Sequence, residues 1–198
     1  MTAAISFADE SGIEALTLRA LGRSLGASTT AVYRYFPDKN ALLAAMRDSL
    51  LGQAIAVPSP PEDPREGLRV AARAFRRTAL AHPCLGPLMA TIALRGSETD
   101  QVPGMVGAAL HALGLRGREL VIAHRQLESF VVGTSIFDMA GAPDHLTDRL
   151  DRLRGVDRPE FSHTLVNAAA VEEINEAAFE ASLDALLSSV TITSRQAP

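Results

Sequence analysis

The sequence predicts an all-α protein: an N-terminal helix-turn-helix domain of three helices, followed by a larger helical bundle. Its long segments are filled with Ala, Leu, Arg and Glu, which favour helices. Apolar–polar alternation with a period of two, which indicates strands, is nearly absent. Gly and Pro divide the chain into short blocks before residue 57 and longer ones after residue 64.

The composition predicts a cytoplasmic protein. The chain has 198 residues, of which 47% are apolar, and a net charge of −4. The single cysteine, Cys84, excludes a disulfide framework and a Cys-rich zinc site. The leading residues MTAAISFADESG lack a cationic start, and no stretch approaches the roughly 18 apolar residues that span a bilayer. We therefore expect neither a secretory signal nor a membrane partner.

The first short helix of the motif follows Thr17, which is a favourable N-cap. Leu18, Leu21 and Leu25 recur at helical spacing and predict one apolar face. Gly26 can adopt the left-handed conformation that ends a helix.

A second short helix is expected after Ser28, which can cap it, with Val32 and Phe36 forming an apolar i, i+4 pair. Two short helices around a Gly-containing turn indicate a helix-turn-helix, whose second helix suits the major groove. The outward or flanking side chains would be Thr29, Thr30, Tyr33 and Arg34. Hydroxyls, a guanidinium and methyl groups can all read base edges. The same pattern also occurs in helical proteins that never bind DNA.

A third helix is expected from Lys39 to about Ala56, capped by Asp38. Lys39 in its first turn opposes the helix dipole, a cost that a phosphate contact would reverse. Residues 57–64 then hold four prolines, which no helix could cross. The predicted organisation is a DNA-binding domain at 1–50, a helix end and Pro-rich linker at 51–64, and a ligand-binding and dimerisation domain at 65–192.

Charge is divided unevenly between these units. Residues 1–50 hold five basic and five acidic side chains, so the remaining 14 basic and 18 acidic residues supply the whole net charge. The N-terminal unit is therefore the part less repelled by a polyanion.

Two segments resemble the DNA-binding domain of the TetR family of repressors: GIEALTLRALGRSLG at 12–26 and AVYRYFPDKNALL at 31–43. FRRTALAH at 75–82 resembles the regulatory domain of the tetracycline-repressor branch. The resemblance implies an all-helical, homodimeric regulator that dimerises through two long C-terminal helices. It would bind a palindromic double-stranded DNA operator and release it on binding a small-molecule effector.

Carried over by position, the resemblance places nine residues at the DNA. Arg19, Thr29, Thr30 and Arg34 would face base edges, Thr17, Tyr33, Tyr35 and Lys39 would hold phosphates, and Ser28 would begin the recognition helix.

The larger domain is expected to contain helices near 65–82, 104–114, 117–140 and 166–191. Ile174, Ala178, Ala181, Ala185 and Ser188 form a stripe on the last of these. Small residues permit close helix approach, as a dimer seam requires. The residues alone favour an ordinary intrachain core, and the family resemblance favours the dimer seam.

An apolar effector cavity with a few polar groups is predicted in this domain. Its candidate residues are His82, Leu85, Met89, Ile92, Met105, Leu127, Glu128, Val131 and Thr134. Met and Leu at helical spacing are also typical of plain core packing. Tetracycline-binding members of the family place a metal-ligating His where this chain has Met89, so we expect an effector other than metal–tetracycline.

No metal, cofactor or enzymatic chemistry is expected. None of the five His residues pairs with another at i, i+3 or i, i+4. Neither a nucleophile elbow nor a phosphate-binding Gly loop is present. His82 near Cys84 could lower the pKa of that thiol, although a lone thiol in an apolar segment usually serves packing. The rival functions are a helical small-molecule or lipid carrier that does not bind DNA and, more remotely, a small helical enzyme.

Overall fold

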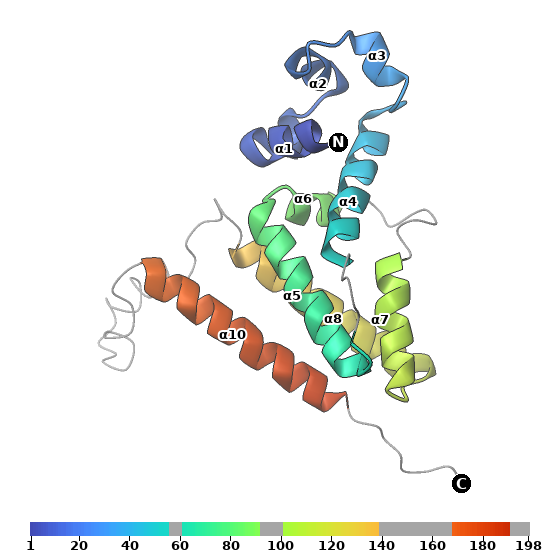
Figure 1. The fold of residues 1–198 in the computed structure, drawn as a ribbon, viewed down its shortest axis with the longest axis vertical. Helices are drawn as coiled ribbons and strands as arrows, with labels where there is room; N and C mark the ends of the chain where they lie inside the picture. The colour runs from blue at the N-terminus through green and yellow to red at the C-terminus, as the bar shows by residue number, and fades with distance from the viewer. Residues whose placement is uncertain (56–60, 92–100, 139–167, 191–198) are drawn as a thin grey trace.

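A computed structural model describes residues 1–55, 61–91, 101–138 and 168–190, and every regular element in these ranges is an α-helix. The all-α prediction is therefore confirmed. Predicted features within 56–60, 92–100, 139–167 and 191–198 lie outside the described residues. Figure 1 shows α1 to α3 at one end of the molecule, with α4 leading from them toward the remaining helices. The helices are α1 (Thr2–Ala15), α2 (Leu18–Ser24), α3 (Thr29–Tyr33), α4 (Lys39–Ile55), α5 (Pro64–Ala81), α6 (Leu85–Thr91), α7 (Gln101–Ala112), α8 (Gly117–Asp138) and α10 (Ala168–Ser189).

The long helices match their predicted ranges closely, and two details differ. The α7 helix begins at Gln101 rather than near 104, because Pro103 falls in the first turn, where a missing N–H breaks no intrahelical bond. The seven-residue α6 was not predicted, because Pro87 reads as a helix breaker although it lies in the first turn, where proline is tolerated.

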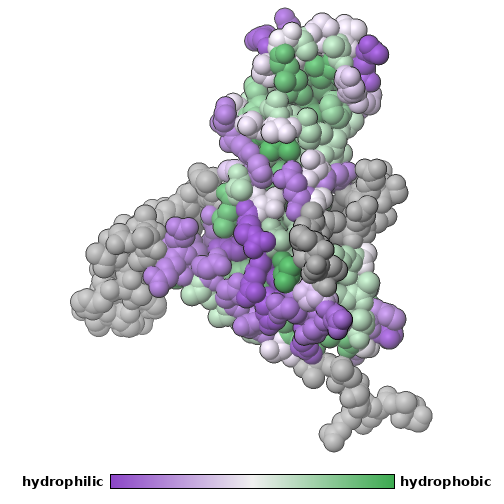
Figure 2. Space-filling view, viewed as in Figure 1, coloured by the Kyte–Doolittle hydropathy of each residue, from purple (hydrophilic) through white to green (hydrophobic). Residues whose placement is uncertain are grey.

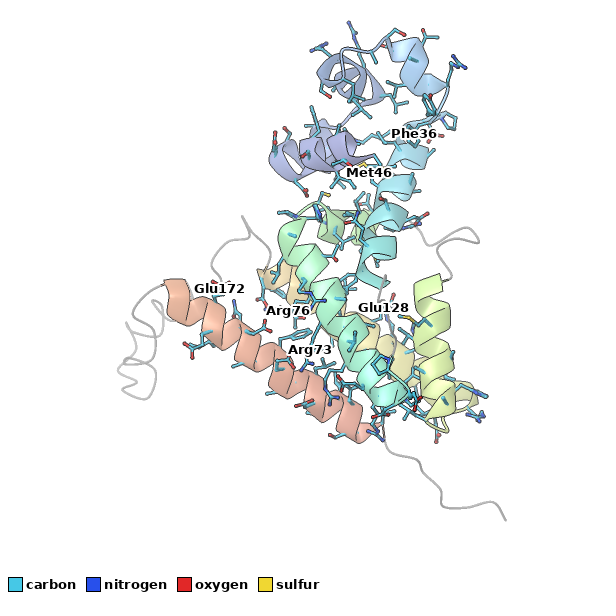
Figure 3. All side chains as sticks on the ribbon, viewed as in Figure 1. Phe36, Met46, Arg73, Arg76, Glu128 and Glu172 are labelled. Atoms are coloured by element: carbon cyan, nitrogen blue, oxygen red, sulfur yellow. The ribbon has the colours of Figure 1, made fainter. Side chains whose placement is uncertain are left out.

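The first apolar core joins the N-terminal helices to α6 and the end of α5. Ile5 of α1 and Met46 of α4 are buried in the same cluster as Leu85 and Leu88 of α6. Figure 3 shows Met46 on the side of α4 that faces α1. This cluster therefore spans the predicted boundary between the two units.

A second apolar core lies among α5, α7, α8 and α10. Leu127 and Val131 of α8 are buried there with Leu183 and Leu187 of α10. The rings of Phe130 and Phe179 stack across α8 and α10 with centroids 5.4 Å apart. These contacts bring helices from both halves of the larger unit together.

Charged side chains join α5 to α10 along the rim of this core. The pairs run in antiparallel order: Arg69 with Asp184 (2.8 Å), Arg73 with Glu180 (2.7 Å) and Arg76 with Glu176 (3.2 Å). Arg65 completes the series by donating to the carbonyls of Leu187 and Val190 at the end of α10. Hydrophilic residues accordingly gather over α5 and α10 in Figure 2, and Figure 3 shows Arg73 on the side of α5 toward α10.

Arg76 is the buried member of the series, with only 4% of its surface exposed. Its Nη1 donates to Asp138 at the end of α8 at 2.6 Å, and its guanidinium carbon lies 4.7 Å from the centre of the Phe179 ring. One side chain of α5 thus contacts both α8 and α10.

Candidate nucleic-acid interface

Two capping hydroxyls define the starts of α2 and α3. The Oγ1 of Thr17 accepts the N–H of Ala20 at 3.0 Å, and the Oγ of Ser28 accepts the N–H of Ala31 at 3.2 Å. Gly26 between the helices has a φ of 62°, as predicted for the residue that ends α2. The helix-turn-helix geometry predicted from these residues is therefore confirmed.

Close packing of α3 on α2 depends on Gly22. A Cβ at this position would lie 3.2 Å from the carbonyl oxygen of Ala27 and 3.4 Å from a methyl carbon of Val32. Val32 is buried and Phe36 packs against the same core, as predicted. Leu25, predicted to complete the apolar face, is instead 53% exposed, because it is the C-cap of α2 and lies beyond its last helical turn.

The predicted DNA-contacting side chains lie outside this core. Tyr33 is 53% exposed and Tyr35 is 80% exposed, while Thr29 is half-buried. Thr17, Arg19, Ser28, Thr30 and Arg34 are also exposed. The exposed group contains aromatic rings, hydroxyls and two guanidinium groups. Such groups suit both base edges and phosphates.

Lys39 has an additional structural contact that the sequence did not reveal. Its Nζ donates to the carbonyl of Glu14 at 3.1 Å, which ties the start of α4 to the end of α1. Asp38 accepts the N–H of Ala41 at 2.8 Å and provides the predicted cap. An ammonium has three N–H groups, so this contact leaves Lys39 able to bind a phosphate.

The candidate effector residues fall into two groups. His82, Leu85 and Met89 lie in the α5–α6 turn or on α6, where Leu85 and Met89 pack with the N-terminal helices. Five others lie on α7 or α8: Met105, Leu127, Glu128, Val131 and Thr134. Ile92 lies outside the described residues.

The polar candidates on α8 already have partners. The Oε2 of Glu128 lies 2.9 Å from the Nη1 of Arg125, and the hydroxyl of Thr134 donates to the carbonyl of Phe130 at 2.8 Å. Figure 3 shows Glu128 among the helices of the regulatory unit. Both groups retain oxygen lone pairs that could accept from a ligand. Their assignment to an effector site stays a prediction.

Cys84 does not have the low thiol pKa that a nearby imidazole could produce. The side chain is buried, and desolvation raises its pKa far above the usual value. The hydrogen bond and negative charge of Asp9 raise it further. A thiol in this state is a poor nucleophile.

Comparison with known proteins identifies the family to which this fold belongs. Residues 1–46 match the family model described as bacterial regulatory proteins of the TetR family, and residues 57–193 match the tetracycline-repressor-like C-terminal domain. The chain belongs to the TetR family. Its curated relatives are described as transcriptional regulators and repressors.

One curated TetR-family relative is the transcriptional repressor DrrR1 of Streptomyces coeruleorubidus, which is 33% identical over 147 residues. That match covers 67% of this chain and 50% of DrrR1, so this chain spans only half the length of that relative.

Solved TetR-family structures share the fold over nearly the whole chain. A possible TetR family regulator from Streptomyces coelicolor A3(2) is 26% identical with a TM-score of 0.74, covering 96% of this chain and 95% of its own. The ActR protein of S. coelicolor in complex with (S)-DNPA is 19% identical with a TM-score of 0.73, covering 96% and 93%. The latter likeness concerns the fold alone.

Two further kinds of site are absent from the described residues. None of their helices combines the length and apolar character needed to cross a bilayer. Nor do residues 1–55, 61–91, 101–138 and 168–190 contain three or more His, Cys, Asp or Glu side chains grouped to hold a metal ion.

Proposed function

We propose that this chain is a cytoplasmic, homodimeric repressor, not an enzyme, that binds a palindromic operator through α3 and releases it when a small molecule binds. The exposed face of α3 carries the proposal. Thr30, Tyr33 and Arg34 stand exposed on a helix whose buried Val32 packs against α2. This combination offers specific donors on a fixed support, as major-groove reading requires.

The homodimer is supported by two exposed helix faces within the described residues. On α10, the exposed stripe of Ala178, Ala181, Ala185 and Ser188 lies opposite the buried Phe179 and Leu183. On α8, Val121 and Ile122 are exposed apolar residues. Small and apolar residues on two long helices suit a helical interface with a second copy. A dimer would present two α3 helices about 34–36 Å apart to successive major grooves.

Effector release is supported by the larger unit. We assign the effector to the residues of α7 and α8, namely Met105, Leu127, Glu128, Val131 and Thr134. The structure of ActR with a bound small molecule supports a ligand-binding role for this fold, and the similarity to the transcriptional repressor DrrR1 supports repression. An effector that favours another spacing of the two α3 helices would shift the population away from DNA.

Selection of DNA from a random duplex library tests the proposal. The wild-type protein is expected to enrich a palindrome, with an affinity that falls steeply as salt rises, because phosphate contacts release counterions. The double variant Thr30→Ala, Arg34→Ala should lose this enrichment. Arg77→Ala is the matched control, because it also removes an exposed guanidinium, but from α5.

The rival function predicts a different result. A carrier that does not read DNA would enrich no sequence even at low salt, while still binding apolar ligands. An equal loss of enrichment in Arg77→Ala and in the α3 variant would also contradict the role assigned to α3.

A further inference from the structure

One carboxylate links the N-terminal helices directly to the regulatory helices. The Oδ2 of Asp9 on α1 lies 2.8 Å from the Nδ1 of His82, and its Oδ1 accepts the backbone N–H of Cys84 at 3.1 Å. His82 and Cys84 lie in the turn between α5 and α6, 73 and 75 residues further along the chain. Both oxygens of one side chain therefore bind one turn.

These contacts act beside an apolar interface. Ile5 and Ala8 of α1 are buried in the cluster that contains Leu85 of α6. Apolar burial favours contact but does not fix direction, whereas hydrogen bonds depend on distance and angle. Two bonds from one carboxylate to two points on a turn therefore restrict sliding and rotation of α1 on that turn.

The orientation of α1 is transmitted to the recognition helix. Leu21 of α2 and Val32 of α3 belong to the same buried cluster as α1, and Lys39 binds the carbonyl of Glu14 near the end of α1. The N-terminal helices thus form one packed unit. Any displacement of α1 on the α5–α6 turn would carry α3 with it.

We propose that Asp9 is a positioning residue that sets which half-site spacing the dimer accepts. The inference rests on the proposed function as a dimeric operator-binding protein. Each added base pair moves a half-site by about 3.4 Å and rotates it by about 35° about the duplex axis. A dimer whose DNA-binding units are fixed at the α5–α6 turn discriminates against such changes. Loss of the Asp9 contacts would allow the units to follow the altered site.

The test uses the operator selected by the full-length wild-type protein, with one or two base pairs inserted at its centre. Wild type is expected to lose about tenfold or more in affinity at two inserted base pairs, and Asp9→Ala less than about threefold. Both proteins should bind a single half-site equally, because the α3 side chains are unchanged. Glu10→Ala removes the same charge from an exposed neighbouring position and should keep the wild-type profile.

Asp9→Asn provides a rescue, because its amide oxygen still accepts from Cys84 and its NH₂ can donate to His82 in the other tautomer. Asp9→Asn should therefore keep the wild-type spacing profile. If circular dichroism shows that Asp9→Ala is unfolded, His82→Ala removes one of the two contacts and should flatten the spacing profile in the same direction. A wild-type profile in Asp9→Ala or His82→Ala, or an equal loss on every duplex including the half-site, overturns the inference. If wild type selects no duplex, the proposed function fails first, and this inference fails with it.

Discussion

The exposed side chains of α3 and its flanks divide by chemistry into groups that can read bases and groups that can hold phosphates. Arg34 presents a planar guanidinium, and Thr30 a hydroxyl and a methyl group, both of which can distinguish base pairs. Tyr33 presents a phenolic hydroxyl, which suits a phosphate oxygen. The two roles predict different results on substitution.

We expect Arg34→Ala to change which bases are tolerated, at a cost of about 1–3 kcal/mol for the preferred site. Tyr33→Phe should weaken binding to all sequences about equally and reduce the dependence of affinity on salt. Affinities for the selected operator and its single-base variants, measured at two salt concentrations, separate these effects. If Arg34→Ala lowered the affinity for all sequences equally while Tyr33→Phe left the affinity unchanged, the roles assigned to these two residues would be wrong.

Gly12 is the residue whose backbone most requires glycine. Its φ of 80° and ψ of 156° interrupt α1 in a region of the backbone map that other residues rarely adopt. Gly12→Ala is expected to lower the free energy of unfolding by about 1–3 kcal/mol, although no heavy atom lies within 4 Å of the added Cβ. Gly52→Ala, within α4 and equally open, should instead gain about 0.5–1 kcal/mol. Urea denaturation measures both, and similar effects at the two sites would contradict the backbone argument.

Among the elements, α5 is the helix that holds the regulatory unit together, and Arg76 is its most consequential polar contact. Arg76→Leu leaves the carboxylates of Asp138 and Glu176 without this partner, so we expect a loss of about 3 kcal/mol in the free energy of unfolding. Arg77→Leu, an exposed neighbour, should change stability by no more than about 0.5 kcal/mol. Equal losses in the two variants would show that the buried pair contributes nothing specific.

The pairing of Glu180 with Arg73 makes the docking of α10 sensitive to acid. The hydrogen bond from Arg73 lowers the pKa of Glu180 below its usual value. A lowered folded-state pKa means that the contribution to stability is present above the pKa of the unfolded chain, about 4.3, and is lost as pH falls further. Between about pH 6 and about pH 3, Glu180→Gln should therefore lose less stability than wild type. Thermal unfolding at the two pH values measures this difference.

Glu173→Gln is the control for this acid dependence, because Glu173 is exposed on the same helix and has no ion pair within the described residues. An identical acid dependence in wild type and Glu180→Gln would contradict the prediction. The size of the effect should stay below about 1 kcal/mol, as is usual for a partly exposed pair.

Sequence reasoning predicted the elements well where the signal was local. Caps at Thr17, Ser28 and Asp38 and the turn at Gly26 depend on residues only a few positions apart. The α6 helix was missed because Pro87, which lies in its first turn, reads as a helix breaker, although Leu85, Leu88 and Met89 recur at i, i+3 and i+4. Short helices were therefore predictable where capping residues marked their starts, as in the five-residue α3, and not by length alone.

At the scale of the whole molecule, the proposed dimer interface makes a sharp prediction. Ala181→Glu places a charge in the centre of the exposed α10 stripe and should dissociate the dimer without unfolding the chain, because Ala181 makes no core contact. Sedimentation velocity should show a monomer, and circular dichroism an unchanged helical signal. Arg77→Glu introduces a carboxylate at an exposed position of α5, outside the stripe, and should leave the dimer intact. Dissociation by both variants, or by neither, would place the interface elsewhere.

Contacts between residues far apart in the chain could not be predicted from the sequence. The Asp9 contacts join residues more than 70 positions apart, and the α5–α10 pairs join residues 100 or more apart. The matching spacing of arginines on α5 and acids on α10 was a usable signal for the latter. Leu85 and Met89 pack with the N-terminal helices, a partner that local periodicity could not identify, and their assignment to an effector cavity stays a prediction.

The burial of Cys84 has a practical consequence for spectroscopy. The chain has no other thiol, and this one is enclosed and held protonated at neutral pH. A cysteine introduced at the solvent-facing Tyr35 position would then be the sole site for a maleimide spin label. Double electron–electron resonance between two such labels would report the separation of the two recognition helices in solution, with and without an inducer, against a background free of native signal.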